Sequence, residues 1–318
     1  MARPLSPAEK LDRLQLSRCG GVGPIGFAKL MQRFGTARRA LAELPRLARE
    51  AGGGDRFRPC PRAEAEAEFE QLERRGWHLV ALGEPAYPEL LAAIEDAPPF
   101  LTVRGDPAAL AGLGVGIVGA RNASGNGRLF ARRLAAELAG RGLVVVSGLA
   151  RGIDTAAHEG ALEPAGGATV AVIASGADVP YPEENAGLME RIAGTGGAVV
   201  SERPLGSEPQ ARHFPRRNRL ISGLSRGIVV VEAAPGSGSL ITARMAAEQG
   251  REVMAVPGSP LDPRHRGTNK LLRDGAALVE GAEDVLALLE PILAATRSPR
   301  RRPARRREAP AAAPTGRT

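Results

Sequence analysis

The chain has 318 residues, of which 43% are hydrophobic and 25% charged, a composition that excludes global disorder and predicts about two domains. No run approaches the roughly 18 apolar residues of a membrane span, and the N-terminus lacks the apolar core of a signal peptide, so we expect a cytoplasmic protein. Its two cysteines, Cys19 and Cys60, cannot build a disulfide framework or a four-ligand zinc site, and we expect no bound metal.

The net charge of +8 is concentrated at the C-terminus. Residues 297–318 contain eight arginines and one glutamate, a net +7 that leaves +1 for residues 1–296. A basic segment rich in proline and alanine is typical of a disordered tail, which adds only non-specific attraction to polyanions. A specific anion site must therefore come from a local cluster elsewhere in the chain.

Residues 1–75 are predicted to form a small helical domain, with helices at 7–19, 24–34, 36–50 and 62–75. The turn Gly20–Pro24 joins the first two helices. A Gly-x-Gly turn between helices is typical of a helix-hairpin-helix (SAM-like) domain, in which backbone N–H groups hold a phosphate without reading sequence. A plain hairpin of two packed helices explains the same pattern.

Residues 76–294 alternate short apolar strands with amphipathic helices. Their Val/Ile runs are continuous, which predicts strands buried on both faces and hence an α/β, Rossmann-like, mostly parallel sheet flanked by helices. The predicted strands are 78–82, 100–104, 115–119, 143–147, 169–173, 198–201, 227–232, 252–256 and 277–279. The predicted helices are 126–140, 154–163, 184–193, 216–224, 239–249 and 282–294, and residues 295–318 form the basic disordered tail.

Three loops rich in glycine and serine each follow a predicted strand and precede a helix. The carboxyl ends of parallel strands share one edge of a sheet, where open α/β sheets bind ligands, so we expect these loops to form one anion-binding crevice. The candidate residues are Gly119, Arg121 and Ser124 in the first loop, Ser147, Gly148 and Gly152 in the second, and Gly236, Ser237, Gly238 and Ser239 in the third.

These loops fit the common nucleotide-binding motifs poorly. In the first, Arg121 follows Gly116-x-x-Gly119 where a dinucleotide site would keep its turn small, and no acidic residue ends strand 143–147. No G-x-x-x-x-G-K-[ST] sequence occurs. The pattern disfavours nicotinamide or ATP binding, and we expect no cofactor.

The densest basic cluster outside the tail lies between Arg203 and Arg226, where six arginines face one glutamate, a net +5. Arginines beside a flat ring suit single-stranded nucleic acid, because guanidinium groups meet phosphates while rings stack on unpaired bases. A solvated basic face on helix 216–224 is the alternative, against which the Phe214–Pro215 step argues. The candidate residues are Arg212, His213, Phe214, Arg216, Arg217, Asn218 and Arg219.

The titratable residues near the crevice have structural explanations. Asp154 and His158 stand four apart on one predicted helix, as an acid–base pair would, but Asp154 is also well placed to cap that helix. Glu202 and Glu232 each end a strand, and because carboxylates would repel an anion, we expect them to hold arginines or loop N–H groups. We therefore predict no catalytic residue.

Several motifs resemble those of the DNA processing protein A (DprA, or Smf) family. They are Gly119–Ser124, Val146–His158, Ser175–Asn185, Phe214–Arg219, Val231–Ala243 and Ala255–Gly258, in the family's order over about residues 100–280. The resemblance implies a homodimer that binds and protects incoming single-stranded DNA and loads RecA recombinase onto it during natural transformation and recombination. It also implies that Arg121 and the Phe214–Arg219 cluster contact the DNA.

Two features depart from the family's pattern. Glu183 and Glu184 follow Tyr181-Pro182, where family members often have a basic residue, so we expect that side of the crevice to contribute less. The family often ends in a winged-helix domain, which we expect to be absent or cut away here.

The alternative function is that of a Rossmann-like enzyme that binds nucleotides or hydrolyses nucleoside monophosphates. Related enzymes carry Pro-Gly-Gly-x-Gly-Thr-x-x-Glu with a catalytic glutamate, whereas this chain reads Pro235-Gly-Ser-Gly-Ser-Leu-Ile-Thr242. A threonine cannot replace that glutamate as general acid or base at neutral pH. We therefore expect the protein not to be an enzyme.

Overall fold

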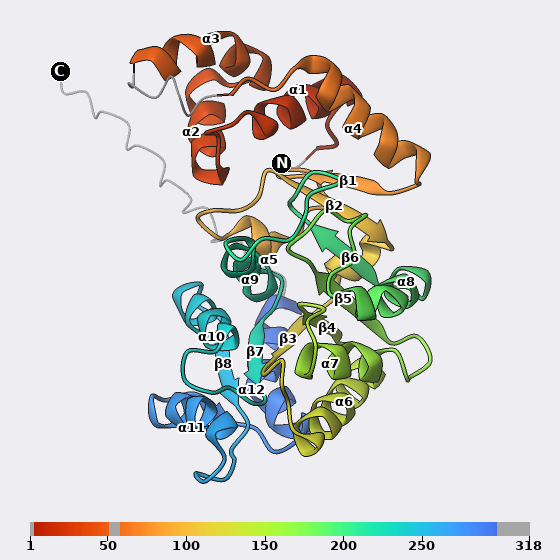
Figure 1. The fold of residues 1–318 in the computed structure, drawn as a ribbon, viewed down its shortest axis with the longest axis vertical. Coiled ribbons are helices and arrows are strands. Elements are labelled where there is room, and N and C mark those ends of the chain that lie inside the picture. The colour runs from red at the N-terminus through yellow and green to blue at the C-terminus, as the bar shows by residue number, and fades with distance from the viewer. Residues whose placement is uncertain (1–2, 51–57, 298–318) are drawn as a thin grey trace, which may run out of the picture.

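The computed structural model describes residues 3–50 and 58–297 (Figure 1). Four helices form an N-terminal layer: α1 (Pro7–Arg18), α2 (Pro24–Phe34), α3 (Ala37–Glu50) and α4 (Arg62–Arg74). Their core includes Leu14, Leu16 and Phe27 and extends onto Leu79 and Phe100 of the sheet, so the layer packs against one edge of the larger region. The four predicted helices of residues 1–75 are present, and the domain boundaries themselves stay a prediction.

A single sheet of nine strands, all of them predicted, organises the rest of the described chain in the order β1-β2-β6-β5-β4-β3-β7-β8-β9. The seven strands from β6 to β9 in this order run parallel, whereas β2 pairs antiparallel with both β1 and β6. The bounds are β1 (His78–Ala81), β2 (Phe100–Gly105), β3 (Gly114–Val118), β4 (Val144–Ser147), β5 (Ala168–Val172), β6 (Ala198–Ser201), β7 (Gly227–Val230), β8 (Glu252–Ala255) and β9 (Ala277–Leu278). The predicted Rossmann-like, mostly parallel sheet is confirmed.

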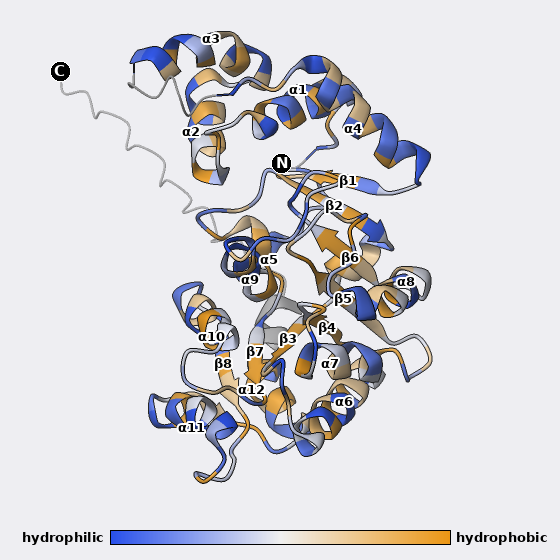
Figure 2. Cartoon of the chain, viewed as in Figure 1, coloured by the Kyte–Doolittle hydropathy of each residue, from blue (hydrophilic) through white to orange (hydrophobic). Residues whose placement is uncertain are grey.

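Helices cover both faces of the sheet. Val144 and Val146 of β4 enter one core while Val145 enters the other, as expected of a strand buried on both faces. One face carries α6 (Gly125–Gly140), α7 (Ile153–Ala161), α8 (Ala186–Gly194) and α12 (Ala282–Arg297), and the other carries α5 (Glu89–Ala92), α9 (His213–Gly223) and α10 (Gly238–Glu248). Figure 2 shows hydrophobic strands such as β3 and β7 between helices that have hydrophilic stretches.

Two predicted boundaries need correction, and some helices were not predicted. α9 begins at His213 rather than at 216, so Phe214 and Pro215 lie in its first turn, where a proline leaves no helical hydrogen bond unmade. α12 extends to Arg297, into the predicted tail, whose remaining residues 298–318 lie outside the described residues. α11 (Arg266–Arg273) and the short α5 (Glu89–Ala92) occupy stretches for which no helix was predicted. Across residues 3–50 and 58–297, no helix is long and apolar enough to cross a membrane.

The strand order places a switch in chain direction beside β3. The chain fills β4, β5 and β6 on one side of β3, then crosses through α9 and fills β7, β8 and β9 on the other. The loops after β3 and β7 therefore diverge from each other. Open α/β sheets bind their ligands in the crevice that such a divergence leaves.

Candidate nucleic-acid interface

A cleft of about 570 Å³ opens at the carboxyl ends of β3 and β7, and we call it the switch-point cleft. Residues of all three predicted loops and of α9 line it, so the loops do meet in one crevice. Asn122, Thr242 and Arg264 also line the cleft, although none was predicted as a site residue. The predicted residues that it brings together are Gly119, Arg121, Phe214, Arg217, Asn218, Ser237, Gly238 and Ser239.

Arg121 and Phe214 form a stacked pair on the wall of this cleft. The guanidinium carbon of exposed Arg121 lies 4.9 Å from the ring centroid of Phe214. Tyr181, which is 39% exposed, packs against Phe214 in a tilted arrangement, with its ring centroid 5.6 Å from that of Phe214 and the rings at 55°. Within the described residues Arg121 has no hydrogen bond or ion pair, so its charge is available to an anion. Tyr181 was missed as a site residue, although it lies in one of the recognised motifs.

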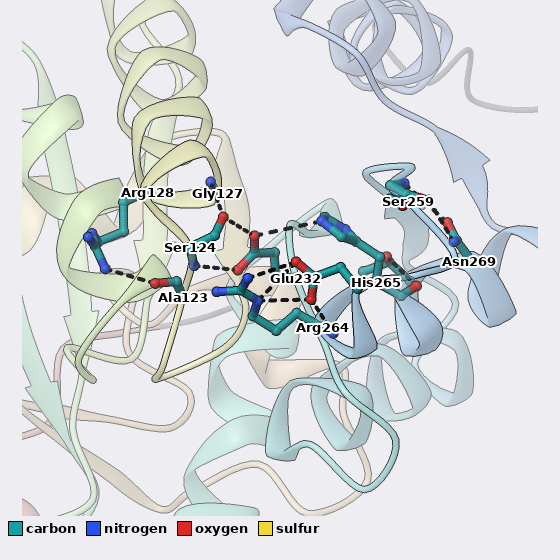
Figure 3. A network of polar contacts seen from close by, with 12 residues as sticks. Ala123, Ser124, Gly127, Arg128, Glu232, Ser259, Arg264, His265 and Asn269 are labelled. Atoms are coloured by element: carbon teal, nitrogen blue, oxygen red, sulfur yellow. Dashed lines mark hydrogen bonds and ion pairs between the residues drawn. The ribbon is translucent and has the colours of Figure 1, made fainter.

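The first loop is anchored from the neighbouring strand end (Figure 3). Ser124 caps α6 by accepting a hydrogen bond from the Gly127 N–H at 2.9 Å. The Ser124 N–H and hydroxyl both donate to Glu232, a fully buried carboxylate that follows β7 and also lies 3.8 Å from His265 Nε2. The prediction that Glu232 holds a loop N–H group is confirmed, and Ser124 itself does not line the switch-point cleft.

The second loop is held from within. Asp154 accepts hydrogen bonds from the N–H groups of Gly148 at 3.1 Å and Ala150 at 3.3 Å, and the Ser147 hydroxyl donates to the Ile117 carbonyl. The predicted capping role of Asp154 was wrong, since Gly152 is the N-cap and Asp154 is the second helical residue. Its carboxylate instead closes the loop that precedes the helix.

His158 completes this internal network. The Thr169 hydroxyl donates to the Val145 carbonyl, so His158 Nδ1 must donate to that hydroxyl, 2.7 Å away. Nε2 is then the acceptor for the Leu149 N–H at 3.3 Å. Burial, followed by the charge of Arg217, lowers the pKa of His158 to about 3, and burial raises the pKa of Asp154. These two residues therefore act as structural partners of the loop, and His158 is a neutral imidazole.

The basic cluster divides into buried and exposed residues. Arg217 is 5% exposed and donates through Nη1 to the carbonyls of Gly148 and Val172, and burial lowers its pKa to about 10. Arg219 forms ion pairs with Glu202 at 2.5 Å and with Asp96 at 3.0 Å, which confirms that Glu202 holds an arginine. Arg212 and Arg216 are exposed at the start of α9.

A second cleft, of about 630 Å³, lies between the α1–α2 turn and α9, and we call it the interdomain cleft. Of the predicted residues, it contains His213, Arg216, Arg217 and Arg219, so Arg217 borders both clefts. The predicted residues that line neither cleft are Ser124, Ser147, Gly148, Gly152, Arg212 and Gly236.

Family models match most of the chain. Residues 78–290 match the model described as DNA recombination-mediator protein A, and residues 7–70 match the DprA-like N-terminal HHH domain. Protein Smf of Escherichia coli is 44% identical over 235 residues, covering 74% of this chain and 63% of that protein. DNA processing protein DprA of Streptococcus pneumoniae is 47% identical over 204 residues, covering 64% of this chain and 71% of that protein.

Solved structures agree with these matches. The X-ray structure of DNA processing protein A from Streptococcus pneumoniae superposes with a TM-score of 0.71 at 36% identity, over 88% of this chain and 96% of that one. A structure of the Helicobacter pylori protein, described as giving insight into its single-stranded DNA binding mode, has a TM-score of 0.61 at 29% identity, over 68% and 96% of the two chains. By its sequence, its sheet and its helical N-terminal layer, the chain belongs to the DNA processing protein A (DprA/Smf) family.

Proposed function

We propose that the chain binds single-stranded DNA in the switch-point cleft and acts in natural transformation and recombination. The observation that carries the proposal is the cluster of Arg121, Phe214 and Tyr181 beside the glycine loops. A guanidinium group and two rings offer one cation for a phosphate and two flat surfaces for unpaired bases. Membership of the family and the described DNA binding of the Helicobacter pylori protein support the same assignment.

The proposed contact set is narrower than the predicted one. Arg121, Phe214, Ser237 and Gly238 line the cleft and are not fully buried, so a strand can reach them. Arg217 and Asn218 donate to backbone carbonyls instead, at Gly148 and Gly238. We assign these two residues the role of holding the loops in place for the strand.

The direct test is a side-by-side titration of labelled single-stranded and double-stranded oligonucleotides of the same sequence at the same salt concentration. We expect tighter binding of the single strand, because only splayed bases can stack on Phe214 and Tyr181. Equal affinity for the duplex would contradict binding in this cleft and would point to the helix-hairpin-helix or to residues 298–318.

The wider role, protection of incoming DNA and loading of RecA by a homodimer, follows from the family and is part of the proposal. RecA assembly on single strands should become faster when the protein is added, and sedimentation should give twice the mass of one chain. RecA assembly at the same rate with and without the protein would contradict the loading role, whatever the result of the DNA titration.

We propose further that the chain is not an enzyme. Among the described residues of the switch-point cleft, the one carboxylate is Asp154, which is 6% exposed and accepts two loop N–H groups. Thr242 is buried and replaces the glutamate of the related hydrolases. Incubation with a panel of nucleoside monophosphates should release no free base, and release of any base would favour the enzyme alternative.

A further inference from the structure

The interdomain cleft has polar groups that the fold leaves without partners. Three side chains that line it are more than nine-tenths buried: His213, Arg217 and Arg219 are 4%, 5% and 7% exposed. In each, one nitrogen finds no hydrogen-bond partner in the described residues, namely His213 Nδ1, Arg217 Nε and Arg219 Nη1. Unpaired buried nitrogens destabilise the folded chain, so three of them around one cleft indicate a missing acceptor.

Arg203 adds a cation that the fold does not neutralise. Its side chain lines the same cleft, its Nε is buried without a partner, and within the described residues its guanidinium forms no ion pair. Burial lowers the pKa of Arg203, Glu202 raises it in part, and the charges of Arg18, Arg216 and Arg212 lower it further. The cleft therefore holds a positive charge at a cost in stability, which an anion would offset.

The opposite wall of the cleft is the turn between α1 and α2. Gly23 is the N-cap of α2 and makes no side-chain cap, and Pro24 has no N–H. The first-turn N–H groups of Ile25 and Gly26, which form the positive end of the helix dipole, therefore have no partner in the described chain. The cleft is also lined by Asp96 and Glu202, but both pair with Arg219, so Arg203, Arg216 and the first turn of α2 leave it with an excess of positive charge.

The first turn of α9 separates the two clefts. Phe214 and Pro215 line the switch-point cleft, while their neighbours His213 and Arg216 line the interdomain cleft. A helix with its side chains is about 10–12 Å across, a span that a flexible strand can cross within a few nucleotides. One strand can therefore occupy both clefts by passing over the start of α9.

We propose that the interdomain cleft is a second phosphate-binding subsite, which holds the backbone of the same single strand after it passes over the first turn of α9. The inference rests on the proposed function of the switch-point cleft. It assigns phosphate contacts to Arg203, Arg216 and the first turn of α2. The helical layer thereby becomes one wall of the DNA path.

The test measures binding of oligothymidylates of roughly 4 to 16 nucleotides, the range of site sizes of single-strand binding modules, to the full chain and two variants. Arg203→Gln removes the unpaired cation. Ile25→Glu places a carboxylate at the start of α2, where it favours the helix but repels a phosphate. We expect each variant to bind the longest oligonucleotide roughly tenfold more weakly, with a salt slope lower by about one phosphate for Arg203→Gln, and to bind the shortest one as the unmodified chain does.

Arg191→Gln and Ala42→Glu are the matched controls, because each makes the same charge change at an exposed residue outside both clefts. Thermal unfolding separates a role of Arg203 in binding from a role in stability, since the Arg203→Gln variant should melt no earlier than the unmodified chain. Normal binding of every length by both cleft variants, while Arg121→Ala weakens every length, would overturn the second subsite and leave the proposed function intact. If Arg121→Ala also binds every length normally, the proposed function fails as well.

Discussion

The loops after β3 and β4 have similar sequences, but their polar groups have different partners. Both leave a buried strand through glycine, contain an arginine and lead into a helix on the same face of the sheet. The first is anchored by Glu232 from the next strand, which leaves Arg121 free above Phe214. The second is anchored by Asp154 and His158 of its own helix and by Arg217.

The difference shows that glycine content alone does not identify an anion-binding loop. In the second loop, the N–H groups of Gly148, Leu149 and Ala150 all donate to side chains of α7, so these three are not available to a ligand. In the first loop Ser124 contacts Glu232 and the Gly127 N–H, the Ala123 carbonyl accepts from Arg128, and Arg121 keeps its donors. A loop whose polar groups pair with its own following helix supports the site, whereas a loop anchored from a neighbouring strand can keep donors for a ligand.

The largest expected effect comes from the buried arginine of the supporting loop. Arg217→Met leaves the carbonyls of Gly148 and Val172 and the charge of Asp154 without their partner, so we expect a loss of about 3–5 kcal/mol in the free energy of unfolding. Urea unfolding measures this loss. The exposed neighbour variant Arg216→Met should stay within about 0.5 kcal/mol. If the Arg217→Met variant were as stable as the unmodified chain but bound DNA poorly, the second loop would have to contact DNA directly.

The binding loop should show the opposite behaviour. Arg121→Ala removes a charge-assisted contact that contributes about 1.5–3 kcal/mol, so we expect single-strand affinity to fall by about one to two orders of magnitude and the salt slope to fall by about one phosphate. The unfolding free energy should hardly change, because Arg121 has no internal ion pair in the described chain. Arg133→Ala on α6 is the control for net charge. Early melting with normal binding would assign Arg121 to the structure.

The supporting loop should also respond to pH through His158. Its pKa is about 3 in the folded chain and about 6.5 when unfolded, so neither state is charged at this residue above pH 6.5. Below that pH only the unfolded state binds the proton, and stability falls by about 1.4 kcal/mol per pH unit until the folded pKa is reached. The expected loss at pH 5 is about 2 kcal/mol.

His158→Gln keeps an acceptor for the Leu149 N–H without the titration. The stability of this variant should depend less on pH between 7 and 5, by the same amount of about 2 kcal/mol, in parallel denaturation series. Parallel profiles for the two proteins would show that His158 is already solvated in the folded state and that the second loop is open to ligands.

The smallest expected effect concerns residues 298–318. A chain ending at Arg297 loses seven arginines and one glutamate, which changes only the non-specific attraction to polyanions. We expect its single-strand affinity at physiological salt to stay within a factor of about three, because the contacts of the first loop are unchanged. Loss of binding in this titration would show that neither loop is the site.

The sheet could be predicted because its signal is local. Each strand is a short apolar run bounded by glycine or polar residues, as in Val144–Ser147, and burial on both faces keeps the run continuous. The direction of β1 and β2 could not be predicted in this way. β2 joins the sheet by pairing antiparallel with β6, which lies almost a hundred residues farther along the chain, and β1 then pairs antiparallel with β2.

The loops of the site could be predicted from the sequence, but which arginines are buried and which are exposed could not. Charge density could not separate buried Arg217 from exposed Arg216, yet the helical period holds the signal, since Arg217 shares a face with Leu220, Ile221 and Leu224. The stack of Arg121 on Phe214 joins residues more than ninety apart and has no sequence signal. The capping error at Asp154 arose because Gly152, with its positive φ of 79°, starts the helix two residues earlier.

The pairing of β2 with β6 has a consequence for folding during synthesis on the ribosome. Thr102 pairs with Ser201, so β2 emerges long before the strand that covers its free edge. At a synthesis rate of about 5–20 residues per second, this edge of β2 stays unpaired for roughly 5–20 s before β6 is made. During this time the nascent chain presents an unpaired apolar strand, the kind of surface that chaperones protect and that other nascent chains can join.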